Sequence, residues 1–217
     1  RKLTVEYTAN PAWMMIQALP YVAQADDKNA VSLAAAYYAN VLGRHIMEQS
    51  PVIKRVVELW KKEDGSAENS LMSALQKNRE LKTLVLDETP WVMDADKEAD
   101  QKRMLSTYFD ESAITYRIAS LLESLHKLQK DNGAWSWWTG MDGSPSMTAQ
   151  VVEMLARLKQ MSGDKNADAM IGKAMHYLDG VVVKEYEEMK KIERKGKAPS
   201  VCDSHAIQYL YINALLD

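Results

Sequence analysis

Apolar residues recur at helical spacing along most of the chain, and the pattern is clearest between residues 111 and 129. Five of them follow one another at steps of four, three, four and three residues: Ile114, Ile118, Leu121, Leu125 and Leu128. Such spacing places all five side chains on one face of an α-helix. Asp131-Asn132-Gly133 follows directly and predicts the end of this helix.

Other segments predict helices for the same reason, and most are bounded by capping residues, glycine or proline. Asn10-Pro11 marks the start of the first one, which Pro20 is expected to bend or end. Asp64-Gly65-Ser66 is expected to break the third. The expected helices cover residues 11–20, 29–48, 51–62, 66–77, 94–108, 145–162, a stretch from 166 onward and 203–216.

Two segments have a different pattern. Residues 2–8 alternate apolar and polar side chains, which predicts a short strand with Leu3, Val5 and Tyr7 on one face. Because a lone strand is unstable, its partners are expected upstream of this chain. Residues 184–195 are densely charged and predict a solvated helix face.

Composition favours an all-α protein. The chain of 217 residues has only 9 Gly, 6 Pro and one Phe, but 13 Met, whereas strands favour β-branched and aromatic residues. Successive amphipathic helices joined by short loops indicate helices paired in antiparallel fashion, as in toroids and solenoids.

Charge and cysteine content exclude several classes. Lys and Arg total 27 against 30 Asp and Glu, so the net charge of -3 argues against a nucleic-acid partner. No apolar run approaches the ~20 residues of a membrane span. Cys202 is the single cysteine, so the chain can form neither an intrachain disulfide nor a multi-cysteine metal site.

One cluster of residues is typical of a carbohydrate-active enzyme. Trp135, Trp137 and Trp138 lie in a loop with Asp131 and Asp142. Aromatic rings could stack sugars while two carboxylates act as acid and base. The alternative, which we favour, is that the tryptophans anchor this loop against the helices, because an indole buries a large area.

Histidine and cysteine give weaker signals. The histidines are scattered, so ordinary surface or core roles are favoured over metal ligation. Cys202 lies near a predicted helix start, where a thiol pKa can fall, but an incidental cysteine is the favoured interpretation. The histidines are His45, His126, His176 and His205.

Several stretches, in this order, resemble the thioester domain of bacterial α2-macroglobulins. They are YTANPAW with QALPY in residues 7–21, YYAN in 37–40, ETPW through FD in 88–110, DNGAWSWWTG with TA in 131–149, and IQYLY in 207–211. The resemblance implies an α/α toroid of antiparallel helical hairpins. It also implies that residues 1–9 end a preceding β-domain, and that residues 10–217 form a helical domain that stops before the ring is complete.

The thioester of that family requires Cys-x-Glu-Gln, in which the thiolate attacks the glutamine amide three residues on. Counting back from Asn40, the four motif positions fall on Asn29, Ala30, Val31 and Ser32. Asn29 supplies no thiolate and Ser32 has no acyl group to donate. The resemblance therefore implies a member that has lost the bond, with no catalytic, cofactor-binding or metal-binding residues.

The function implied by the resemblance is that of an endopeptidase inhibitor, not an enzyme. The full-length parent would trap proteases without a covalent bond, this chain would contact neighbouring β-domains, and the location would be the periplasm or cell envelope, with a lipoprotein anchor upstream. Two alternatives stay open: an α/α-toroid carbohydrate-active enzyme, and a ligand-binding module that uses the tryptophan loop. The enzyme requires two carboxyl groups facing each other across an open cleft.

Overall fold

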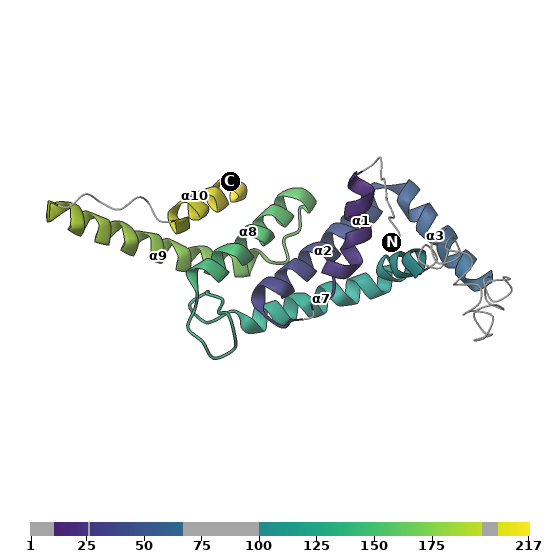
Figure 1. Cartoon of the computed structure of the whole chain (residues 1–217), viewed down its shortest axis with the longest axis horizontal. Coiled ribbons are helices and arrows are strands. Elements are labelled where there is room, and N and C mark those ends of the chain that lie inside the picture. The colour runs from purple at the N-terminus through teal and green to yellow at the C-terminus, as the bar shows by residue number, and fades with distance from the viewer. Residues whose placement is uncertain (1–10, 26, 67–99, 197–203) are drawn as a thin grey trace, which may run out of the picture. The chain divides into compact units, whose positions relative to one another are not determined.

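The computed structural model describes residues 11–25, 27–66, 100–196 and 204–217 (Figure 1). Within these ranges the regular structure is helical throughout, which confirms the all-α class. Residues 100–108 also form a helix, which carries no label. The labelled helices are α1 Pro11–Val22, α2 Ala30–Gln49, α3 Pro51–Ser66, α7 Glu111–Leu128, α8 Pro145–Ser162, α9 Asp168–Arg194 and α10 Ser204–Leu216.

Some expectations lie outside the described residues. These are the strand at 2–8, the helix at 66–77 beyond its first residue, the first part of the helix at 94–108, and the environment of Cys202.

α1 continues past Pro20 to Val22, so this proline does not end the helix, which was one of the two effects expected of it. The predicted end of the third helix is wrong. α3 continues through Asp64-Gly65-Ser66. A glycine costs a helix only about 1 kcal/mol relative to alanine, so it does not by itself end a helix.

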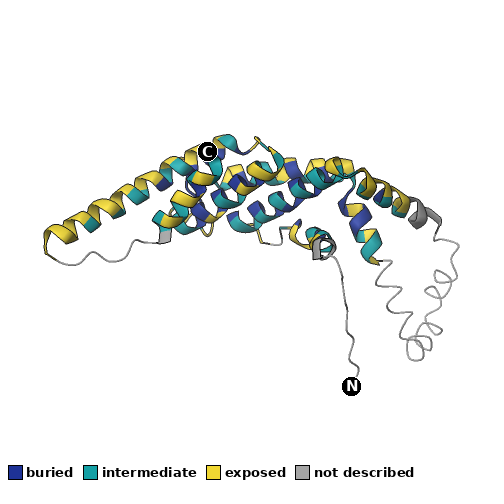
Figure 2. Cartoon of the chain, turned by 90° about the horizontal axis from the view of Figure 1, so that it is seen from above, coloured by how far each residue is buried: buried dark blue, intermediate teal, exposed yellow. Residues whose placement is uncertain are grey.

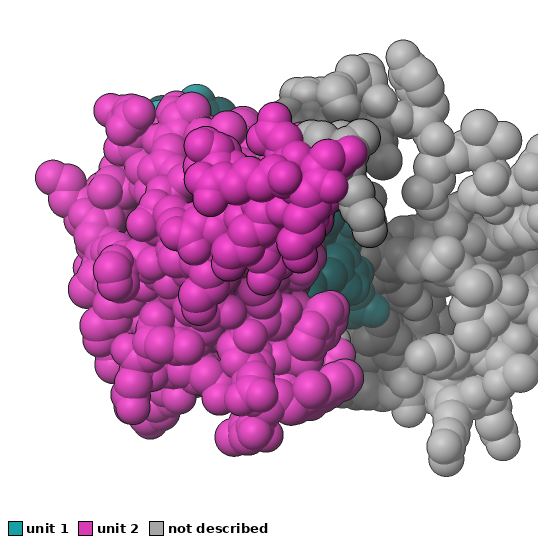
Figure 3. Space-filling model, turned by 90° about the vertical axis from the view of Figure 1, so that its left-hand side faces the viewer, with its two compact units in different colours: residues 1–21, 43–115 teal, residues 22–42, 116–217 magenta. Residues whose placement is uncertain are grey.

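The chain divides into two compact units. Unit 1 comprises residues 1–21 and 43–115, and unit 2 comprises residues 22–42 and 116–217. Figure 3 shows the packed surface of unit 2.

Unit 1 has a small core of large side chains. Leu105, Tyr108 and Phe109 are buried, and the rings of the last two meet edge to face with centroids 4.7 Å apart. Gly43 lies against this cluster, and a Cβ at that position would come within 2.3 Å of the Tyr108 hydroxyl oxygen. The glycine is therefore required for the tyrosine to pack against α2.

Asp110 caps the N-terminus of α7 in unit 1. One carboxylate oxygen accepts a hydrogen bond from the Ala113 backbone N–H at 3.0 Å, and the other lies 2.9 Å from the Lys61 ammonium. The hydrogen bond from Lys61 lowers the pKa of Asp110, and the bond from Ala113 adds to this. The ionised carboxylate is thus the form that the folded state favours.

Replacing Asp110 with alanine is expected to lower the free energy of unfolding by about 1 kcal/mol at neutral pH, the usual value of a helix cap. Because the folded pKa lies below the unfolded value of about 3.9, the stabilisation is present above that pH and is lost as the pH falls through the folded pKa. Urea unfolding at several pH values checks this. Asp110→Asn, which retains the cap but not the charge, should lose less stability; an Asp110→Ala loss that stays constant to pH 2 would contradict the assignment.

Unit 2 is built from the first part of α2, most of α7, and α8, α9 and α10. Helix α8 packs against both α9 and α10, and α10 also contacts α9 (Figure 1). Asn40 is fully buried in α2, where its amide donates to the carbonyl oxygens of Ala23 at 3.1 Å and Ala36 at 2.8 Å, and accepts from Arg117 Nε at 2.8 Å. A buried amide with these partners fixes the chain entering α2 against α7.

The stretch from residue 166 and the charged run form one helix, α9, of 27 residues. Its last turns are exposed, as expected of a solvated face, and Figure 2 shows this along the outer part of the helix. Among the described residues, no helix combines the length and apolar character that crossing a bilayer requires.

Candidate functional site

The loop between α7 and α8 is held in place by Trp135. This side chain is fully buried, and its Nε1 donates to the Leu125 carbonyl oxygen at 3.0 Å, one of the last four carbonyls of α7, which lack helical partners. Its backbone N–H donates to Thr148 Oγ1 at 2.9 Å, and its carbonyl accepts from the Ser144 N–H at 2.8 Å. Trp135 therefore connects the end of α7 to the start of α8.

Trp137 and Trp138, in contrast, lie on the surface. Their side chains are 46% and 69% exposed, and the ring centroids are 6.4 Å apart with the planes inclined by 36°. Ser136 Oγ donates to the Trp138 carbonyl oxygen at 2.9 Å, which stabilises the turn that presents them. The three tryptophans thus have different roles: the anchoring interpretation holds for Trp135 and does not account for the other two.

The four positions that the resemblance assigns to the thioester motif form the cap and first turn of α2. Asn29 Oδ1 accepts a hydrogen bond from the Ser32 backbone N–H at 2.8 Å, as an N-cap side chain does. Ala30 is fully buried, whereas Val31 and Ser32 are partly exposed. The spacing of three residues therefore brings the outer two positions together at a helix start.

This helix start and the exposed tryptophans line one groove of about 660 Å³, all within unit 2. A volume of this size lies within the range of about 300–1,000 Å³ typical of small-molecule sites. The sequence pointed to the two segments separately, and the structure places them on the same cavity. The lining residues are Asp27, Lys28, Asn29, Val31, Ser32, Trp137, Trp138, Thr139, Met147 and Gln150.

The carboxylates expected of a glycosidase do not line this groove. Asp131 and Asp142 are both exposed and lie outside it, and among its described lining residues Asp27 is the one acidic side chain. A glycosidase needs a pair of carboxyl groups on either side of the scissile bond. The structure therefore gives no support to Asp131 and Asp142 as that pair.

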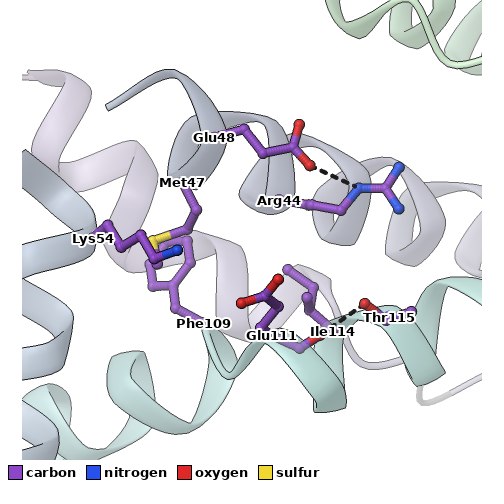
Figure 4. Close-up of a pocket in the computed structure, with 8 residues that line it drawn as sticks. All are labelled: Arg44, Met47, Glu48, Lys54, Phe109, Glu111, Ile114 and Thr115. Carbon is purple, nitrogen blue, oxygen red and sulfur yellow. Dashed lines mark hydrogen bonds and ion pairs between the residues drawn. The ribbon is translucent and has the colours of Figure 1, made fainter. Parts of the chain in front are cut away.

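A second, smaller cavity of about 280 Å³ lies in unit 1 (Figure 4). Met47, Phe109 and Ile114 supply its apolar lining, and the Nε of Arg44 lies 3.8 Å from the carboxylate of Glu48 at its edge. Both ends of this ion pair are partly exposed, so it contributes little stability. Glu111, Lys54 and Thr115 complete the lining.

Three of the four histidines have unremarkable positions: His45 is half-buried, and His126 and His176 are exposed. Within the ranges that the structure describes, no group of three or more His, Cys, Asp or Glu side chains is placed to hold a metal ion.

His205 is different, and sequence reasoning missed its partners. Ser146 Oγ lies 2.9 Å from His205 Nε2, and His205 Nδ1 lies 3.1 Å from Glu185 Oε1. The three residues come from α8, α10 and α9, all in unit 2. Separations of 59 and 20 residues leave no spacing signal that could have predicted the group.

Comparison of the chain with models of known families, with curated proteins and with solved structures found no match.

Proposed function

We propose that this chain is a helical domain of a bacterial α2-macroglobulin-like endopeptidase inhibitor that has lost the thioester and traps proteases without a covalent bond. In this proposal, the helices of residues 10–217 form part of an α/α toroid, residues 1–9 end a β-domain, and the parent protein acts in the periplasm or cell envelope. Trapping is steric, so it requires no catalytic group, cofactor or metal in this chain.

The observation that carries the proposal is the position of Asn29 and Ser32. They occupy the cap and first turn of α2, and the Asn29 side chain reaches across three residues to the Ser32 N–H at 2.8 Å. A cysteine and a glutamine at these two positions would lie at the spacing that a thioester requires. The Asn29 side chain instead caps the helix by accepting from the Ser32 backbone N–H, so in this proposal the two positions keep a structural role after loss of the bond.

The groove beside this turn supports the same interpretation. In a thioester protein the reactive bond has to be accessible to a nucleophile only after activation. Here Ser32 and Val31 line an open groove with Trp137 and Trp138. Because residues 29–32 cannot form a thioester, an exposed turn at this position has no reactive bond that water could hydrolyse.

We expect the full-length parent to slow cleavage of a large protein substrate much more than cleavage of a short peptide by the same protease. A steric trap excludes large substrates while leaving the protease active site accessible. Parallel assays with a protein and a chromogenic peptide measure this, and denaturing electrophoresis of the mixture should show no protease adduct. Methylamine treatment followed by thiol titration should release no thiol.

Two results would contradict the proposal. Equal inhibition of both substrates would indicate blockage of the protease active site instead of a trap. A thiol released by methylamine, or an adduct that survives denaturation, would show that a reactive acyl bond exists elsewhere in the parent.

A further inference from the structure

Three polar side chains converge in unit 2 where the first turns of α8 and α10 meet the middle of α9. Ser146 and His205 are each the second residue of their helices, and Glu185 faces them from α9. Figure 1 shows α10 lying along α8 and α9. Ser146 Oγ, the two imidazole nitrogens and Glu185 Oε1 form a continuous chain of hydrogen-bond distances, 2.9 Å and then 3.1 Å.

From this geometry we propose that Ser146 is a nucleophile, His205 its general base and Glu185 the residue that orients His205, and that the group hydrolyses carboxylic esters of small acyl groups. A nucleophile within hydrogen-bond reach of a base that is itself oriented by a third group is the structural signature of nucleophilic catalysis. This activity goes beyond the proposed function, because trapping by sterics is unaffected by whether Ser146 reacts.

The imidazole is oriented for this role. In the tautomer that carries its proton on Nδ1, His205 donates to Glu185, and Nε2 accepts the hydroxyl proton of Ser146. Glu185 Oε2 is buried, and among the described residues it has no hydrogen-bond partner.

Neighbouring contacts hold α10 in the register that this geometry needs. Gln208 Nε2 donates to Glu153 on α8 at 2.9 Å, and the Tyr209 hydroxyl donates to Asp179 on α9 at 3.0 Å. These bonds lie within one turn of His205 and connect α10 to both partner helices. The base is thus placed by packing before any ligand binds.

The group reaches the surface of unit 2, and the start of α8 is electrostatically suited to an anionic intermediate. The side chains of His205 and Glu185 are 22% and 28% exposed, and Ser146 is half-buried. Ser146 lies in the first turn of α8, a helix of 18 residues, where the helix dipole favours negative charge. Charge developing on the carbonyl oxygen would be stabilised there.

The reaction balances without a further reagent. Ser146 Oγ forms a bond to the ester carbonyl carbon as its proton passes to His205 Nε2. The bond to the leaving alkoxide breaks, and His205 returns the proton to release an alcohol and an acyl-serine. Water then attacks the acyl group by the same route, which releases the carboxylic acid and restores Ser146.

A fluorophosphonate probe tests the proposal on the intact chain. The probe reacts with activated serines and leaves ordinary hydroxyls unmodified, and peptide mass spectrometry identifies the modified residue. We expect rapid modification of Ser146 and none of Ser162, whose hydroxyl on the same helix donates to the Leu158 carbonyl oxygen at 2.7 Å. This comparison is made within one wild-type sample and so does not depend on any variant folding.

Variants then separate activation from structure. His205→Gln and Glu185→Gln should slow both Ser146 modification and hydrolysis of p-nitrophenyl acetate by about 100-fold or more, the usual contribution of a general base. Ser162→Ala should change neither rate. Circular dichroism and urea unfolding identify any variant that has lost its fold, and Glu185→Gln, which preserves size, serves as the second test if His205→Gln loosens α10.

The proposal is overturned if Ser146 of the wild-type chain is modified no faster than Ser162, or if folded His205→Gln and Glu185→Gln retain the wild-type rate. Neither result would bear on protease trapping by the parent, and loss of trapping would not bear on Ser146.

Discussion

Replacing Trp135 with alanine is expected to lower the free energy of unfolding by about 3–5 kcal/mol, the usual cost of deleting a buried aromatic side chain. The indole is fully buried, so the substitution leaves a cavity within unit 2. It also removes the hydrogen bond from Nε1 to the Leu125 carbonyl oxygen at the end of α7. Because the free energy of unfolding of a domain is only about 5–15 kcal/mol, the substitution would remove a large part of the stability of this unit.

Urea unfolding followed by far-ultraviolet circular dichroism measures this loss. Trp138→Ala is the matched control, since it removes the same side chain three residues along the same loop, where 69% of it is exposed. Its effect should stay within about 0.5 kcal/mol, as for most surface substitutions. Similar losses for the two variants would show that Trp135 is not the anchor.

Trp135→Phe separates the two contributions. Phenylalanine retains much of the packing but donates no hydrogen bond, so the Leu125 carbonyl oxygen loses this donor. The loss should be intermediate, with about 1–3 kcal/mol attributable to the unsatisfied carbonyl.

Helix bounds that depend on local chemistry were predictable from the sequence. Ser144 caps α8, Pro145 is its first residue, and Gly163 follows its end with a φ of +70°, so each signal is read within one turn of the chain. Asp64-Gly65-Ser66 contains turn-forming residues, so the sequence predicted that the third helix ends before them. This prediction was wrong, because α3 extends through all three residues. Local preference predicts where a helix can end, whereas packing and continued hydrogen bonding decide whether it does.

The candidate sites were predictable only in part. The tryptophans and residues 29–32 were candidates from the sequence, but their shared groove depends on how the α7–α8 loop lies against α2. Trp135 is buried because its indole and backbone bond to Leu125 and Thr148. The residues next to Trp135 in the sequence do not predict these partners. The Ser146–His205–Glu185 group joins three helices, and isolated serine, histidine and glutamate residues carry no pattern that predicts their meeting.

Replacing Gly133 with alanine is expected to destabilise unit 2 through two separate effects. The residue has a φ of +87°, where an L side chain is strained by about 1–3 kcal/mol. A Cβ would also lie 2.2 Å from the Lys173 carbonyl oxygen on α9, and this backbone atom cannot move without shifting the helix. Overpacking of this kind typically costs a further 1–3 kcal/mol, roughly as much again as the strain.

Gly140→Ala separates the two effects. Gly140 has nearly the same φ, +89°, in the same loop, but a Cβ there meets nothing within 4 Å. It should therefore show the strain alone, and the difference between the two variants in urea unfolding measures the contact with α9. Gln129 should lose its bond to the Met170 carbonyl oxygen in Gly133→Ala only, because this bond needs the end of α7 and the loop to lie against α9. Equal destabilisation by the two substitutions would mean that Gly133 is required for its backbone conformation and not for the approach of the loop to α9.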